Sequence, residues 1–155
     1  MFDQLFPQRI DNTYRGHKLA LWLFGLLLLM KTVISLNSIF NGYSVASSAD
    51  GIPLDTYPSG AARTVVSLWA LMALSQFMIC LLCTLVLVRY RGMVPIMFAL
   101  FLLQHLGGRL ILQFLPIDRT GTPPASAINL ALLTLIIVGL ALSLASRKSM
   151  ANALN

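Results

Sequence analysis

The chain has 155 residues, of which 57% are hydrophobic and only 10% are charged. Soluble domains usually carry about 25% charged residues, because a surface that faces water needs them. With less than half that share, the chain cannot cover a water-soluble globule, and its high apolar content excludes a disordered protein. The composition therefore predicts an integral membrane protein.

The formal net charge of the chain is +6. In a soluble protein such an excess of basic residues suggests nucleic acid as a partner. Here the Lys and Arg residues stand in ones and twos near the ends of apolar runs, and the sequence contains no basic stripe interleaved with aromatic residues. The charge pattern therefore speaks against a nucleic-acid partner and for the lipid bilayer as the surroundings of the chain.

Four apolar runs are long enough to cross a membrane, since a helix needs about 20 mostly apolar residues to span about 30 Å of hydrocarbon. The predicted spans are 19–40, 64–88, 93–115 and 125–144. Backbone groups in lipid must find hydrogen bonds within their own segment, so these spans are expected to be helices. The sequence thus predicts an all-α fold, a single membrane domain built as a four-helix bundle.

The Lys and Arg residues are distributed unequally between the two sides of this bundle. One side carries seven of them: Arg9, Arg15, Lys18, Arg89, Arg91, Arg147 and Lys148. The opposite side carries only Arg63 and Arg119. Cytoplasmic loops are enriched in basic residues, so both termini are predicted to be cytoplasmic, an N-in/C-in topology. The absence of Asn-x-Ser/Thr sites and of cysteines in the outer loops favours a bacterial inner membrane.

Two segments outside the spans have more than one interpretation. Phe2, Leu5 and Phe6 have the i, i+3, i+4 spacing of a short interfacial helix, and an unstructured terminus fits them equally well. A cleaved signal peptide is not favoured, because the first apolar run exceeds the usual 7–15 residues and contains Lys31. The Gly- and Pro-rich loop 41–62 is expected to form turns, either as a cap over the outer mouth of the bundle or as an inert linker.

The spans contain cations but no carboxylate, since all five acidic residues are aspartates that lie outside the spans. Proton- and cation-coupled carriers usually need an acid inside the membrane, so the sequence disfavours that class. At 1.5 Å per residue, Lys31 lies about 18 Å and Arg109 about 24 Å along their helices from the cytoplasmic side. Both cations are therefore expected in the outer half of the bundle, at similar depths.

The third span carries a polar stripe around Arg109. His105 lies one turn before it and Gln113 one turn after it, and Gln104 precedes His105. Two bare cations at similar depth repel each other unless an anion lies between them. Together with Lys31, these residues form a candidate binding site for an anionic or hydrogen-bond-accepting ligand, such as a lipid phosphate, a quinone carbonyl or a small acid.

Two other interpretations of these cations stay open. In the first, Lys31 and Arg109 extend outward and pair with aspartates of the outer loops, for which Asp50, Asp55 and Asp118 are the candidates. In the second, an acidic residue of another subunit neutralises Arg109. Neither of these interpretations requires a ligand.

Small residues in the third and fourth spans indicate places of close approach. The Gly107-Gly108 pair suits packing against a neighbouring backbone, or a ligand that comes close to the helix. Small residues spaced four apart form ridges at helix interfaces. In the fourth span such pairs are Ala127 with Ala131, Gly139 with Ser143, and Ala141 with Ala145. These ridges are expected to face either the bundle or another membrane protein.

Other chemistry finds little support in the sequence. Cys80 and Cys83 form a C-x-x-C motif, but it starts about 24 Å along its helix from the outer side, and the chain has no second cysteine pair. With Gln76 on the same face, these cysteines are interpreted as packing groups. His17 and His105 lie at different depths and cannot hold a haem together. We therefore expect no catalytic residue, no metal site and no cofactor.

Two functions follow from these features. The first is an accessory or assembly subunit of a larger membrane complex, with helix 125–144 as its interface. The alternative is a carrier or receptor for an anionic amphiphile bound in the outer half of the bundle. An enzyme ranks below both, because the spans hold no acid or activated nucleophile. The observation that separates the first two is whether Lys31 and Arg109 face the same interior cavity. If they point to lipid or to opposite sides, the ligand-binding alternative loses its basis.

Overall fold

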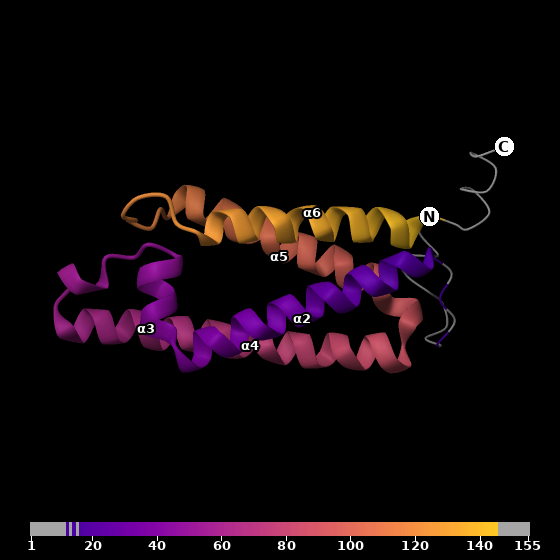
Figure 1. Cartoon of the computed structure of the whole chain (residues 1–155), viewed down its shortest axis with the longest axis horizontal. Coiled ribbons are helices and arrows are strands. Elements are labelled where there is room, and N and C mark those ends of the chain that lie inside the picture. The colour runs from indigo at the N-terminus through magenta and orange to yellow at the C-terminus, as the bar shows by residue number, and fades with distance from the viewer. Residues whose placement is uncertain (1–11, 13, 15, 146–155) are drawn as a thin grey trace.

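The computed structural model of the protein describes residues 12, 14 and 16–145, and over these residues the chain is helical, with no β-strand. The framework consists of four long helices, α2 (Lys18–Phe40), α4 (Ser59–Arg89), α5 (Val94–Phe114) and α6 (Ala125–Leu144) (Figure 1). Each of them is long and apolar enough to cross a membrane. For the described residues, the prediction of an all-helical chain with four long apolar helices is thus confirmed, although α4 begins at Ser59 rather than near residue 64.

Some features used in the sequence analysis lie outside the described residues. One is the interfacial segment that contains Phe2, Leu5 and Phe6. Another is a group of four cations used for the orientation: Arg9, Arg15, Arg147 and Lys148.

The local sequence explains where the long helices begin and end. His17 caps α2, since its ring Nδ1 accepts a hydrogen bond of 3.2 Å from the backbone N–H of Leu19. Pro58 and Pro124 precede α4 and α6, where the missing proline N–H leaves no helical hydrogen bond unmade. The helix α5 ends just before Leu115, the residue before Pro116, because a proline disfavours helical backbone in the residue that precedes it.

The connection between α2 and α4 is folded. Its elements are α3 (Gly42–Ser44), the π-helical turn η1 (Val45–Ala49) and the 3-10 turn η2 (Leu54–Thr56). Ala46, Ile52 and Leu54 are buried in this segment and pack together with Trp69 of α4. The connection therefore differs from the run of turns expected for loop 41–62, because its apolar side chains form a small core against α4.

Aromatic side chains join α2 to α5 near one end of the bundle. We call this the terminal end, where α2 begins and α6 ends, and the opposite one the loop end (Figure 1). The ring of Phe24 lies 5.0 Å from that of Phe98, edge to face, and 6.3 Å from that of Phe101, centroid to centroid. All three rings, which we call the aromatic core, are buried. Such edge-to-face and tilted arrangements are favourable ring geometries.

The helix α6 reaches the aromatic core through a glycine. Gly139 is buried, and a β-carbon at this position would overlap the ring of Phe98. Ser143, one turn further along α6, is also buried, and its hydroxyl donates a hydrogen bond of 2.7 Å to the carbonyl oxygen of Leu140. Of the three expected small-residue pairs, the pair Gly139 and Ser143 therefore lies inside the bundle.

Toward the loop end the four helices separate into two pairs. The helix α2 packs on α4 and has buried residues from Ala20 to Ser38, whereas α5 packs mainly on α6 and touches α2 and α4 at few points. The buried residues of α5 end at Phe101, and none of the residues 103–131 is buried. Figure 1 shows the result: α2 lies beside α6 at the terminal end and beside α4 toward the loop end.

A backbone contact joins the two pairs again at the loop end. The carbonyl oxygen of Gly51 accepts a hydrogen bond of 2.8 Å from the backbone N–H of Thr120 and one of 3.2 Å from its hydroxyl. Gly51 has φ +73°, a conformation that favours glycine. A β-carbon there would also lie 3.1 Å from the carbonyl oxygen of Thr120. We call this contact the clasp.

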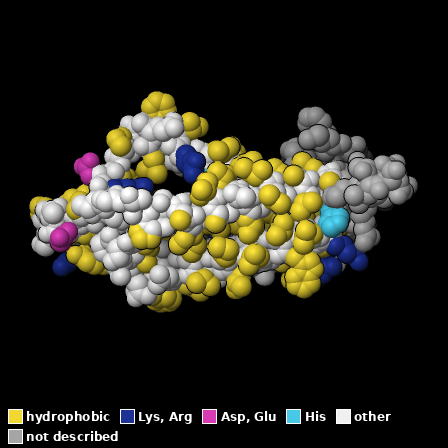
Figure 2. Space-filling view, turned by 45° about the horizontal axis from the view of Figure 1, so that its top comes forward, with side chains coloured by type: hydrophobic (Ala, Val, Ile, Leu, Met, Phe, Trp, Pro, Cys, Tyr) yellow, Lys and Arg dark blue, Asp and Glu magenta, His cyan; other side chains and the backbone are white. Residues whose placement is uncertain are grey.

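The surface between the two ends is apolar. Trp22, Leu29 and Leu103 are each more than 60% exposed, and Figure 2 shows one face on which hydrophobic side chains cover most of the length. The acidic side chains visible on this face lie toward one end. A continuous apolar surface of this kind is a liability in water and suits contact with lipid chains.

Candidate functional site

Lys31 lies near the middle of α2, at the point where the aromatic core ends. Its Nζ atom is 4.9 Å from the centroid of the Phe101 ring, within the distance of a cation–π interaction. The neutral thiols of Cys80 and Cys83 on α4 lie near Lys31. The lysine therefore lies between α4 and α5. One sequence-based interpretation expected it to extend toward the aspartates of the loop end, and it does not.

His105 connects Lys31 with Arg109. The side chain of His105 is half-buried, and its Nε2 atom is buried without a hydrogen-bond partner among the described residues. The charges of both Arg109 and Lys31 act on this imidazole. The imidazole is therefore near both cations, which come from different helices, although Arg109 itself is exposed.

The outer part of the predicted polar stripe is exposed. Both Arg109 and Gln113 are exposed on the loop-end half of α5. Within residues 16–145, Arg109 forms no ion pair with Asp118, which is exposed as well. The stripe therefore divides: His105 lies toward Lys31, Arg109 lies at the border of this region, and Gln113 is not brought to it.

Gln104 forms a hydrogen bond with a residue that the sequence analysis treated only as packing. Its Nε2 atom donates to Oε1 of Gln76 on α4, at 2.8 Å. The Nε2 atom of Gln76 in turn lies 3.7 Å from the sulfur of Cys80, within hydrogen-bond distance for sulfur. The sequence signal that points to Gln76 is its position one helical turn from Cys80. We call Lys31, Gln76, Gln104 and His105 the Lys31 site.

The two cysteines are free thiols, and both are buried. Cys83 belongs to the same cluster of buried side chains as the aromatic core. This placement fits the interpretation of both residues as packing groups. Among the described residues, no three His, Cys, Asp or Glu side chains are grouped so that they could hold a metal ion.

The glycine pair of α5 does not have the packing role expected for it. A β-carbon built at Gly107 or at Gly108 would meet no atom within 4 Å. No helix therefore approaches α5 closely at these positions within the described part of the chain. The physical reason is the separation of the helix pairs, which leaves the loop-end half of α5 without a neighbour on this face.

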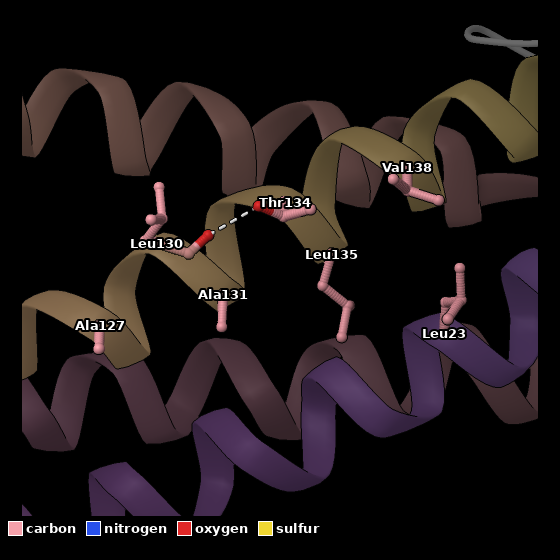
Figure 3. Close-up of a pocket in the computed structure, with 7 residues that line it drawn as sticks. All are labelled: Leu23, Ala127, Leu130, Ala131, Thr134, Leu135 and Val138. Carbon is pink, nitrogen blue, oxygen red and sulfur yellow. Dashed lines mark hydrogen bonds between the residues drawn. The ribbon is translucent and has the colours of Figure 1, made fainter.

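A second feature of the separated helices is an apolar groove between α2 and α6 (Figure 3). Its volume is about 510 Å³. The groove is lined by Leu23 of α2 and, on α6, by Ala127, Leu130, Ala131, Thr134, Leu135 and Val138. The hydroxyl of Thr134 donates to the carbonyl oxygen of Leu130, so it offers no free donor to a ligand. The small residues Ala127 and Ala131 therefore line an open groove instead of a helix contact.

The predicted counter-ions lie at the loop end. Asp50 is half-buried beside Arg119, whereas Asp55 and Asp118 are exposed. Asp50 directly precedes Gly51, and Arg119 directly precedes Thr120, so this pair of charges flanks the clasp. The aspartate therefore lies near a cation of the neighbouring loop and not near Lys31.

Asp50 should make the stability of the loop end depend on pH. Burial raises the pKa of its carboxyl above the ordinary value of 3.8, and the Arg119 charge opposes this effect. Because the pKa is raised in the folded state, Asp50 stabilises the fold fully below its unfolded pKa, and this contribution is lost as the pH rises through the folded pKa. Asp50→Asn is therefore expected to raise the melting temperature at neutral pH and to flatten its pH dependence in this range.

Thermal unfolding in detergent at a series of pH values between about 3 and 7 tests this expectation, since this range brackets the ordinary Asp pKa. Asp55→Asn is the matched control, because Asp55 is exposed in the same segment. A pH dependence of the Asp50→Asn variant equal to that of the unmodified protein would contradict the expected role of burial.

Comparison with known proteins finds no family model, no curated protein and no solved structure that matches this chain. The function therefore has to be inferred from the geometry and chemistry of the Lys31 site and its surroundings.

Proposed function

We propose that the protein is a small membrane protein that binds an anionic amphiphile at the Lys31 site, as a carrier or receptor. The observation that carries the proposal is the position of the Lys31 ammonium group. It lies on the face of Phe101, where the packed core ends and the helix pairs begin to separate. A lysine held there by its own fold is suited to meet a ligand that enters between the helices.

The charges around Lys31 support an anionic ligand. The positive charges of both Lys31 and Arg109 lie near His105, and the long helices contain no carboxylate to balance these cations. A cation inside the hydrocarbon region is costly unless an opposite charge or polar groups accompany it. Carboxylate or phosphate oxygens can accept hydrogen bonds from the ammonium group and supply that charge. This arrangement supports the ligand-binding alternative through Lys31 and His105, whereas Arg109 is exposed and lies outside the interior.

The α2–α6 groove supports the amphiphilic character of the ligand. It offers apolar side chains and a threonine whose hydroxyl is already hydrogen-bonded. Its volume of about 510 Å³ falls in the usual range of small-molecule sites, about 300–1,000 Å³. A hydrocarbon chain is the group that such a surface accommodates without leaving polar atoms unpaired.

The proposed orientation follows from the distribution of Lys and Arg. We propose that the terminal end faces the cytoplasm of a bacterial cell and that the loop end lies outside its inner membrane. In that orientation the Lys31 site lies toward the outer leaflet, and the ligand enters from there.

Removal of the Lys31 charge tests the proposal. When the protein is purified in mild detergent from native membranes, the Lys31→Met variant should retain about tenfold less anionic lipid or fatty acid than the unmodified protein. This magnitude corresponds to the loss of one charge-assisted hydrogen bond, about 1.5–3 kcal/mol. Mass spectrometry of the bound lipids gives the readout. Lys18→Met is the control, because Lys18 is exposed at the start of α2; equal anionic lipid in all three proteins would refute the proposal.

The accessory-subunit function remains the second candidate. The observation that favours it is the exposed loop-end half of α5, where Arg109 and Gln113 have no described partner and Gly107 and Gly108 leave open space. An acidic helix of another membrane protein fits such a surface. Blue-native electrophoresis of the same preparation separates the two candidates, because a subunit runs in a complex larger than the chain itself, whereas a lipid carrier does not require one.

A further inference from the structure

The hydrogen bond between Gln76 and Gln104 crosses from one helix pair to the other. Most side-chain hydrogen bonds among the described residues stay within one helix or turn, as that of Ser35 to the carbonyl oxygen of Lys31 does. The bond from Gln104 to Gln76 instead joins α5 to α4, two helices that otherwise touch at few points. The contact of Gln76 with Cys80 helps to orient the glutamine amide.

This bond lies next to Lys31 on its loop-end side. Gln76 is one turn from Cys80, and Gln104 is nearly one turn from Phe101, in each case toward the loop end. At 1.5 Å per residue, these separations are about 6 Å and about 4.5 Å along the two helices. Because Lys31 lies against Phe101 and close to Cys80, the glutamine pair lies beside Lys31 on its loop-end side, with Gln76 half-buried and Gln104 exposed. A molecule that comes to Lys31 from this side meets the pair first.

The chemistry of this pair discriminates between molecules that approach it. An apolar molecule that separates the two amides leaves both without a partner in a region poor in water, which costs the full penalty of an unsatisfied polar group. A head group with hydrogen-bonding oxygens accepts the hydrogen bond that Gln104 otherwise donates to Gln76, so its entry costs little free energy. The helices α4 and α5 share few other contacts, so little else has to be broken when a head group replaces this hydrogen bond.

We propose that the Gln76–Gln104 hydrogen bond is a specificity filter for the Lys31 site. It admits amphiphiles whose head groups replace the bond and rejects molecules that carry hydrocarbon alone. Gln76 is thus a specificity-determining residue that does not itself need to pair with the anionic charge. This inference rests on the proposed function, since it assumes that a ligand reaches Lys31, and it adds the hydrogen-bonding class of the head group.

The test compares two probes that share a tail and a fluorophore. Pyrenedecanoic acid carries a carboxylate and decylpyrene carries none, and both accept excitation energy from the tryptophans of the protein, Trp22 and Trp69. With the full chain in lipid nanodiscs, titration of each probe gives the concentration for half-maximal energy transfer. The selectivity is the ratio of the decylpyrene value to the acid value.

The filter predicts that Gln76→Leu lowers this selectivity at least about fivefold, the effect of roughly one hydrogen bond. The loss arises because decylpyrene no longer has to break a hydrogen bond and therefore binds more tightly. Gln104→Leu should lower the selectivity at least as much, because it also removes the N–H group that the head group takes over, and the double variant should add nothing to the effect of Gln104→Leu. Ser75→Leu is the matched control, because Ser75 is exposed next to Gln76 and its hydroxyl bonds only within α4.

The possible outcomes separate the filter from the proposed function. If the glutamine bond only holds α4 and α5 together, both probes bind more weakly in the variants and the selectivity is unchanged, which refutes the filter. Selectivity that falls equally in Ser75→Leu refutes it too. If instead the unmodified protein does not prefer the acid, and Lys31→Met leaves acid binding unchanged, the proposed function itself fails.

Discussion

Replacing Gly139 with leucine is expected to destabilise the protein by about 1–3 kcal/mol, the usual cost of forcing extra atoms into a packed interior. Gly139 is buried on α6, and even a β-carbon there would overlap the Phe98 ring. This ring cannot simply move away, because it is fully buried and packs edge to face on Phe24. The substitution therefore pushes α6 away from the aromatic core that joins α2 and α5.

Titration with a denaturing detergent, with unfolding monitored by circular dichroism, measures this loss of stability. Gly108→Leu is the matched control, because a β-carbon at Gly108 meets no atom within 4 Å. There the loss of a flexible glycine from a helix should stabilise the protein slightly, by about 0.5–1 kcal/mol. A similar loss of stability in both variants would contradict the packing of α6 on Phe98.

Replacing Lys31 with methionine is expected to have the opposite effect on stability, a gain of about 1–3 kcal/mol in protein freed of lipid. A lysine at the centre of a spanning helix costs about 2.5–3.5 kcal/mol, and the contact with Phe101 returns about 0.5–1 kcal/mol of this. Methionine has a similar length and no charge, so it fills the same space without that cost. The hydrogen bond from Ser35 uses the backbone oxygen of residue 31 and remains.

The same unfolding experiment measures this gain, with Lys18→Met as the control for the substitution at an exposed position. Addition of an anionic amphiphile should then stabilise only the protein that keeps Lys31, since a ligand of the native state adds to its stability. A Lys31→Met variant less stable than the unmodified protein would show that the lysine is a structural element of the fold. The combination of greater stability and lost binding is typical of residues retained for function.

The fold class was predictable from the sequence because its signals are local. The length and apolar character of each span can be read from about twenty neighbouring residues, and prolines such as Pro58 and Pro124 mark helix starts. The segment between α2 and α4 was less predictable. Its small core of Ala46, Ile52 and Leu54 depends on contacts with α4 that no short window of sequence contains.

The candidate site was predictable only in part, for the same physical reason. Charged and polar residues inside apolar runs stand out, so Lys31, His105 and Arg109 were identified at once. Gln76 was taken for packing, because an isolated glutamine gives no sign of its partner on another helix. Only the arrangement of α4 and α5 brings it within 2.8 Å of Gln104.

The small share of charged residues, 10% of the chain, was enough to predict a membrane protein, and the lengths of the continuous apolar runs predicted the four long helices. Those properties depend on the balance between the side chains and their solvent, which is a matter of composition. The tertiary structure alone decided which cation lies inside. Lys31 and Arg109 look alike in the sequence, but α2 is packed along its length, whereas the loop-end half of α5 has no buried residue. Packing density, which depends on how the helices cross, therefore made Lys31 the centre of the site and left Arg109 at its border.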